Sequence, residues 1–177
     1  LSSDGKTLYF SSERPGGYGG KDIYRSVIQA DGTWGTAINM GQMINTPYDD
    51  DAPFIHPDNR VLLFSSKGKQ SMGGYDVFRT VYNLTDSSWS DPENLGFPIN
   101  TPDDEIYYVL SADGKSGYYS SGKAEGYGLQ DIYQVSPGLI GLTPLLTLLK
   151  GKTTVQGVPV ESTITIDNES KKQNFTQ

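Results

Sequence analysis

A repeat of 54 to 55 residues constrains this chain more than any other feature of its sequence. Residues 1–26 read LSSDGKTLYFSSERPGGYGGKDIYRS, and related runs begin at Ile55 and Leu110. Five features recur in one register, which chance does not explain, so the chain contains copies of one supersecondary unit. The recurring positions are Asp4, Asp58 and Asp113; Ser12, Ser66 and Ser121; Asp22, Asp76 and Asp131; Trp34 and Trp89; and the Asn-Thr-Pro turns at 45–47 and 100–102.

Each copy consists of short strands separated by turns. In the first copy an Asp-Gly turn at residues 3–6 precedes a compact apolar run at residues 7–11. A glycine-rich loop then leads to an alternating segment at residues 22–27, and a weaker strand runs from Trp34 toward Met40. Four short strands in about 55 residues, with no helical period, predict a β-propeller blade.

The predicted fold class is therefore all-β, with about two and a half four-stranded propeller blades followed by the beginning of a β-sandwich. The predicted blades are residues 1–40, 41–95 and 96–136. Leu1 aligns with Ile55, so most of the first strand of the first blade is missing. Because a closed propeller needs about four blades or more, we expect this chain to be a piece of a longer protein with exposed strand edges.

Residues 137–177 are predicted to form a linker and the first strands of a sandwich. The most apolar stretch, from Gly138 to Leu149, has 12 residues and contains Pro144. Crossing a bilayer takes about 20 apolar residues, so this stretch predicts a buried strand or a packing segment between domains.

Composition excludes several classes of function. With 14 Lys and Arg against 21 Asp and Glu, the formal charge is −7, which disfavours a nucleic-acid partner. The chain has no Cys, which removes disulfides, thiol nucleophiles and Cys-ligated zinc. No cofactor is predicted.

The repeat resembles a known family. The run (Ile/Leu)-x-x-Asp-Gly-Lys-x-x-x-(Phe/Tyr)-Ser-Ser, followed by Gly-Gly-Tyr and Asp-(Ile/Val)-(Tyr/Phe), is similar to the WD40-like repeat of TolB-type propellers. With its Trp, Asn-Leu-Gly and Ile-Asn-Thr-Pro segments, the unit most resembles OmpA-family outer-membrane proteins of Bacteroidota, one of which belongs to type IX secretion.

In that family the propeller precedes a carboxypeptidase-regulatory-like sandwich and a peptidoglycan-binding OmpA-type domain. The tail from Leu149 to Ile166 resembles the opening strands of the sandwich. No residue here matches the OmpA-type domain, so peptidoglycan would be reached only through a domain outside this sequence. The resemblance implies a periplasmic, outer-membrane-associated protein with envelope or secretion proteins as partners and only an indirect link to the membrane.

Two acidic clusters have two interpretations. Repeat alignment places Asp49 on Asp104 and Asp50 on Glu105. Carboxylates at one blade position are typical of caps on backbone N–H groups, and clustered carboxylates also suit Ca²⁺, although the EF-hand spacing is absent.

The glycine-rich loops also have two interpretations. The first loop lacks the Walker pattern, because Pro15 and Asp22 stand where Gly and Ser or Thr are needed. Packing between blades is the favoured role, and a ligand-binding rim formed by Tyr18, Tyr75 and Tyr127 is the alternative.

The remaining candidate residues are expected to have structural rather than catalytic or ligand-binding roles. Burying Trp34 and Trp89 removes much apolar surface from water, which predicts packing rather than carbohydrate stacking. The single His, His56, aligns with the turn residues Ser2 and Ser111, so we expect it to be exposed. There is no Gly-x-Ser-x-Gly elbow, and no enzyme is predicted.

The sequence thus predicts a non-catalytic propeller scaffold for protein–protein interaction. A glycan- or peptide-binding propeller is the alternative, and the accessory propeller of a hydrolase is the third hypothesis.

Overall fold

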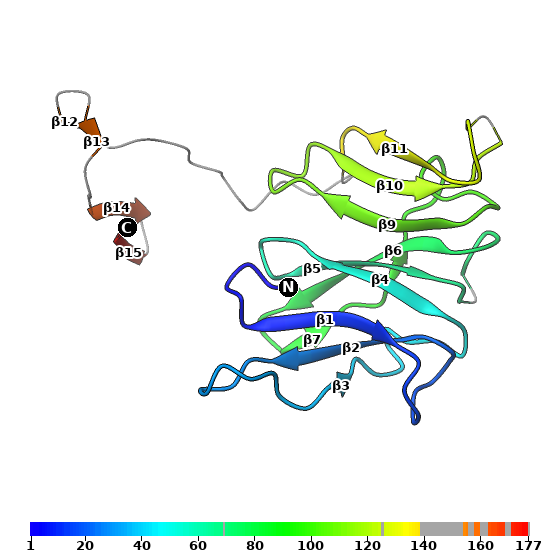
Figure 1. Cartoon of the computed structure of the whole chain (residues 1–177), viewed down its shortest axis with the longest axis horizontal. Coiled ribbons are helices and arrows are strands. Elements are labelled where there is room, and N and C mark those ends of the chain that lie inside the picture. The colour runs from blue at the N-terminus through cyan, green and yellow to red at the C-terminus, as the bar shows by residue number, and fades with distance from the viewer. Residues whose placement is uncertain are drawn as a thin grey trace. The chain divides into compact units, whose positions relative to one another are not determined.

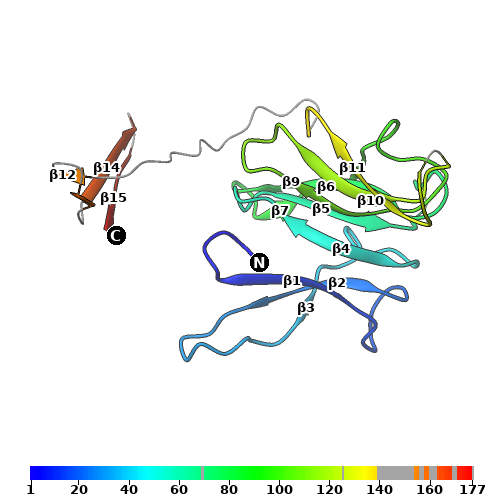
Figure 2. The same cartoon turned by 45° about the horizontal axis from the view of Figure 1, so that its top comes forward.

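The structure, a computed structural model, describes residues 1–68, 70–124, 126–138, 154–155, 158–159, 163–168 and 171–176. Within these residues every regular element is a strand and none is a helix, so the all-β prediction is confirmed. The chain divides into two compact units, residues 1–147 and 148–177. In the first unit three antiparallel sheets are stacked face to face (Figure 1, Figure 2).

Each sheet corresponds to one predicted blade. The first contains β1 (Thr7–Ser12), β2 (Asp22–Val27) and β3 (Ile38–Asn39). The second contains β4 (Asp50–Ile55), β5 (Val61–Ser66), β6 (Asp76–Asn83), β7 (Ser88–Trp89) and β8 (Glu93–Asn94). The third contains β9 (Glu105–Leu110), β10 (Gly117–Ser121) and β11 (Asp131–Val135). The first sheet has no counterpart of β4, as the alignment of Leu1 with Ile55 predicts.

Strand β5 is buried on both faces because the middle sheet is covered from both sides. All six residues of β5 are buried. Leu62 and Phe64 pack in a cluster with Ile23 of the first sheet, whereas Leu63 packs with Tyr108 of the third. This two-sided burial explains why the apolar run at residues 61–64 is continuous rather than alternating.

An asparagine side chain ties each connection between sheets to the preceding sheet. The backbone N–H of Ile23 donates to Asn45 Oδ1 at 2.7 Å, and Asn45 Nδ2 donates to the Ile23 carbonyl at 2.9 Å. Asn100 makes the same pair of bonds with Val77, at 2.8 and 2.9 Å. Both asparagines are fully buried, so these bonds fix where the next blade begins.

The two tryptophans differ, and the packing prediction is wrong for Trp34. Trp89 is half-buried and lies edge-on to Tyr9 of the first sheet, with 6.4 Å between ring centroids, and 5.1 Å from Tyr82. Trp34 is 43% exposed, and its backbone forms a β-bridge with Ile28. Trp89 gains its cover from the neighbouring sheet, and the described residues place no sheet on the matching side of the first sheet.

The second unit contains two hairpins, as expected for the opening strands of a sandwich. They pair β12 (Thr154–Val155) with β13 (Val158–Pro159) and β14 (Thr163–Asn168) with β15 (Lys171–Thr176). The predicted boundary at residue 136 stays a prediction, and most of the apolar stretch from Gly138 to Leu149 lies outside the described residues. No helix in the described part of the chain is long and apolar enough to cross a membrane.

The unequal tryptophans give a matched test of packing between sheets. Trp89→Ala should lower the free energy of unfolding by about 2–3 kcal/mol, because it removes ring contacts with Tyr9 of the first sheet and Tyr82 of the second. Trp34→Ala should cost less than about 1 kcal/mol. Urea denaturation, monitored by circular dichroism, measures both losses. Equal losses would contradict the claim that only Trp89 packs between sheets.

Candidate functional site

The glycine-rich loops and the connections between sheets lie at one end of the blades. Ser66, the last residue of β5, is opposite both Asp50 and Asp76, so the connection entering β4 and the hairpin loop leaving β5 meet there. We call this end the loop face. Its described residues are those of the hairpin loops, 13–21, 67–68, 70–75, 122–124 and 126–130, and those of the connections, 40–49 and 95–104.

The loop face is tightly packed where a hairpin loop meets the next connection. A Cβ at Gly19 would overlap the carbonyl oxygen of Tyr48, and one at Gly73 would overlap that of Pro102. Only glycine allows these close approaches, which accounts for its recurrence in both loops.

A buried carboxylate closes each connection. Asp50, which is fully buried, accepts hydrogen bonds from Ser66 Oγ and from the backbone N–H of Thr46, both at 2.5 Å. Glu105 accepts from Ser121 Oγ at 2.7 Å and from the Thr101 N–H at 2.8 Å. Burial raises the pKa of Asp50 to about 6, although its hydrogen bonds with Ser66 and Thr46 act in the opposite direction.

The neighbouring carboxylates contact the preceding hairpin loop. Asp49 accepts from the Lys21 N–H at 3.1 Å, and Asp104 accepts from the Tyr75 N–H at 2.8 Å. Hydrogen atoms therefore already point at oxygens that a Ca²⁺ ion would need. Within the described residues no three His, Asp or Glu side chains come together as ligands for one metal ion, so the calcium interpretation of Asp49, Asp50, Asp104 and Glu105 has no ligand set there.

The repeated aspartates accept backbone hydrogen bonds at both ends of the blades. Three of them lie on the loop face, and each accepts a hydrogen bond of 2.7 Å from the backbone N–H four residues earlier. The pairs are Tyr18 to Asp22, Met72 to Asp76 and Tyr127 to Asp131. The other three lie at the opposite end, and each accepts a hydrogen bond from the backbone N–H two residues later. These pairs are Lys6 to Asp4, Arg60 to Asp58 and Lys115 to Asp113. These six carboxylates serve the turns.

The predicted tyrosine rim is wrong for Tyr75. The hairpin loops have equal lengths, so Tyr18, Met72 and Tyr127 share one position, whereas Tyr75 aligns with Lys21. Tyr18 is 50% exposed, but Tyr75 is buried beside Asp49, and Lys67 Nζ lies 4.3 Å from its ring centroid. Burial and the charge of Asp49 raise the pKa of Tyr75.

The prediction that His56 is exposed is also wrong. Its side chain is buried, with Nε2 3.4 Å from the Ser111 carbonyl oxygen and Nδ1 3.2 Å from Asp58 Oδ2. The turn after β4 packs against the corresponding turn of the third sheet, which covers the imidazole. His56 lies at the end of the blades opposite the loop face.

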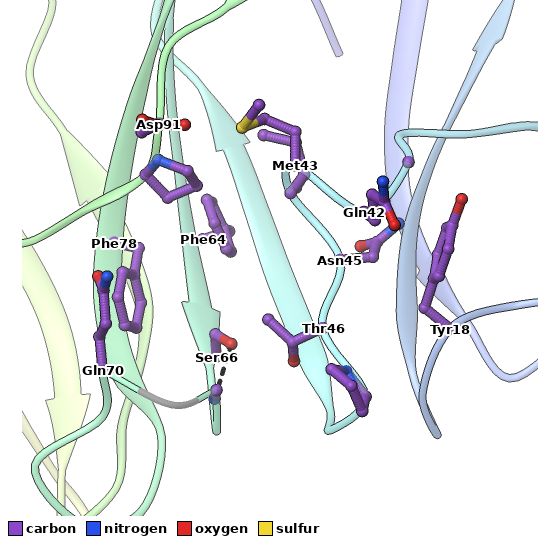
Figure 3. Close-up of a pocket in the computed structure, with 15 residues that line it drawn as sticks. Tyr18, Gln42, Met43, Asn45, Thr46, Phe64, Ser66, Gln70, Phe78 and Asp91 are labelled. Atoms are coloured by element: carbon purple, nitrogen blue, oxygen red, sulfur yellow. Dashed lines mark hydrogen bonds between the residues drawn. The ribbon is translucent and has the colours of Figure 1, made fainter.

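A cavity of about 980 Å³ opens at the loop face beside the second sheet. Figure 3 shows Phe64, Phe78 and Gln70 on one side and Met43, Gln42 and Tyr18 on the other. Phe64 and Phe78 are buried members of the core between the first two sheets, while Tyr18 and Met43 are each 50% exposed. The cavity has an apolar floor and a mixed rim, which suits it to binding an inserted side chain or small group.

The stacked sheets and their recurring turns define this class of protein as a partial β-propeller. Two solved structures share the fold. Putative TolB from Agrobacterium tumefaciens is 19% identical, with a TM-score of 0.55 over 78% of this chain and 44% of that one. TolB from Acinetobacter baumannii is 17% identical, with a TM-score of 0.54 over 98% of this chain and 38% of that one.

This chain therefore spans less than half the length of either solved protein. At these identities the similarity establishes the TolB-type propeller fold. No family model and no curated protein matches the sequence.

The raised pKa of Asp50 predicts a dependence of stability on pH. Its pKa is 3.8 in the unfolded chain and about 6 when folded, so the folded state binds more protons between these values. The contribution of Asp50 to stability is thus greatest below pH 3.8 and falls as the pH rises toward 6, by up to about 3 kcal/mol.

Asp50→Asn, which cannot ionise, provides the reference. The wild-type free energy of unfolding should fall relative to that of the variant between pH 4 and about pH 6.5. Urea melts at intervals of half a pH unit measure the difference. A constant difference across this range would show that Asp50 ionises in the folded state as it does in water.

Proposed function

We propose that this chain is a non-catalytic propeller scaffold that docks partner proteins. The observation that carries the proposal is that the carboxylates and the cavity of the loop face have different roles. Its carboxylates, such as Asp50 and Asp104, are committed to hydrogen bonds within and between blades, whereas the adjacent cavity is open and has exposed apolar side chains at its rim. That arrangement suits binding rather than bond-breaking chemistry.

We further propose that the scaffold works in the periplasm, associated with the outer membrane as part of an envelope or secretion assembly. The TolB-type fold supports the periplasmic scaffold part of this proposal. The resemblance of the repeat to OmpA-family proteins of Bacteroidota supports the outer-membrane association, the type IX secretion link and the regulatory-like sandwich in the tail.

A glycan- or peptide-binding module remains the second candidate, because Tyr18 lies exposed at the cavity rim. An aromatic ring at a cavity mouth could stack on a sugar.

Affinity capture with the tagged full-length protein tests the scaffold. The structure offers a matched pair of variants, since Met43 lines the cavity and is 50% exposed, whereas Met72 is 49% exposed on the same face outside it. Met43→Lys should lose partner proteins that wild type and Met72→Lys retain, because a positive charge at the rim disfavours apolar docking and repels a cationic side chain. Glycan-array binding with no captured protein would instead favour the second candidate.

A further inference from the structure

In each blade a pair of stacked aromatic rings occupies the same repeat position, and in the third blade Tyr108 stacks on Tyr119 as well. Residues directly opposite on the two central strands supply the repeated pairs, with ring centroids about 6 Å apart. The pairs are Phe10–Tyr24 at 6.1 Å, Phe64–Phe78 at 5.9 Å and Tyr119–Tyr133 at 5.7 Å, with interplanar angles of 24°, 23° and 27°.

In the first and third blades a cation from the hairpin loop covers the pair. The Arg14 guanidinium lies 5.1 Å from the Phe10 centroid and 4.7 Å from that of Tyr24. Lys123 Nζ lies 5.1 and 5.0 Å from its two rings. At such distances each cation is attracted to both rings of the cross-strand pair.

The second blade has no side chain at this position. Ten residues separate Ser12 from Asp22, Ser66 from Asp76 and Ser121 from Asp131, so Arg14, Gly68 and Lys123 align without a gap. Gly68 and both rings, Phe64 and Phe78, line the cavity.

Lys67, which precedes Gly68 in the sequence, contacts another ring. Lys67 Nζ lies over Tyr75 and 3.7 Å from Asp49. Among the described residues no Lys or Arg lies over the Phe64–Phe78 pair.

We propose that this cavity receives a lysine or arginine side chain from a partner protein. The incoming cation would take the place that Arg14 and Lys123 occupy in the other blades. Lys123 Nζ also donates to the Pro98 carbonyl at 3.0 Å. Met43, which lines the cavity, aligns with Pro98, so the repeat predicts its carbonyl as the matching acceptor for the incoming cation. Asp91 at the cavity and the net charge of −7 favour a cationic occupant.

This inference rests on the proposed function only in assigning the cation to a partner protein. The site itself is tested with the peptides acetyl-Gly-Gly-Arg-Gly-Gly-amide, its Lys counterpart and a Gln control, titrated into protein with ¹³C-labelled Phe. The Arg and Lys peptides should shift the ring resonances of Phe64 and Phe78 saturably, and the Gln peptide should not.

Gly68→Lys supplies the missing internal cation and should weaken binding of the Arg peptide at least about ten-fold. Gly68 has no left-handed φ, but its Cβ would lie 2.9 Å from Thr46 Cγ2 and 3.1 Å from Ser66 Oγ, so the Thr46 side chain has to shift. Gly128→Lys adds the same charge where a Cβ meets nothing within 4 Å, and this control should bind as wild type does. Should Gly68→Lys fail to fold, Phe78→Leu removes one ring, retains an apolar floor and should also weaken binding.

Lys69 lies outside the described residues, so the titration is repeated with Lys69→Ala. Saturable binding of the cationic peptides to the wild-type protein supports the proposal, whereas binding to Lys69→Ala alone would show that Lys69 fills the site and would overturn it. Binding of the Gln peptide with equal affinity, no binding to either protein, or undiminished binding to Gly68→Lys and Phe78→Leu would each overturn it. Partner capture that persists alongside a failed peptide titration would refute the cation site and leave the scaffold intact.

Discussion

The carboxamides of Asn45 and Asn100 are the interaction on which the stacking of the blades depends. Each pairs with the N–H and carbonyl of one residue on the preceding sheet, as a neighbouring strand would. Each also donates to a second asparagine, Asn39 or Asn94, which in turn donates to the aspartate that begins β2 or β6. A buried polar chain of this kind has one satisfied geometry, so it sets the position of each connection and of the blade that follows.

A framework repeated so closely lets single residues decide what each blade presents. The hairpin loops have equal lengths and the aromatic pairs have nearly equal geometry. The repeat position that holds Arg14, Gly68 and Lys123 can therefore differ between blades and change the surface while the sheets stay the same. On the loop face the first and third blades carry their own cations, whereas the second blade borders an open cavity. Variation at a fixed position is how a repeat fold acquires a specific binding surface.

The repeat predicted the sheets well because strand and turn residues recur at fixed offsets, and β2 was placed at its observed bounds. Neighbour-dependent features were not predictable. Trp34 is exposed while Trp89 is half-buried, and His56 is covered by a turn 55 residues away. Ala52 and Tyr107 adopt left-handed backbone angles, φ 51° and 61°, at matching irregularities of the inner strands, although neither is the glycine or asparagine that such angles favour. The Arg14, Gly68 and Lys123 position was visible in the sequence, but its meaning required the rings beneath it.

The central claim is that one repeat position decides whether a blade holds its own cation or accepts another. Lys123→Gly tests it most directly, because it should open at the third blade the kind of cavity that Gly68 leaves at the second. Calorimetric titration with the Arg peptide should then give two sites per chain instead of one. A stoichiometry that stays at one, with the variant folded, would contradict the account.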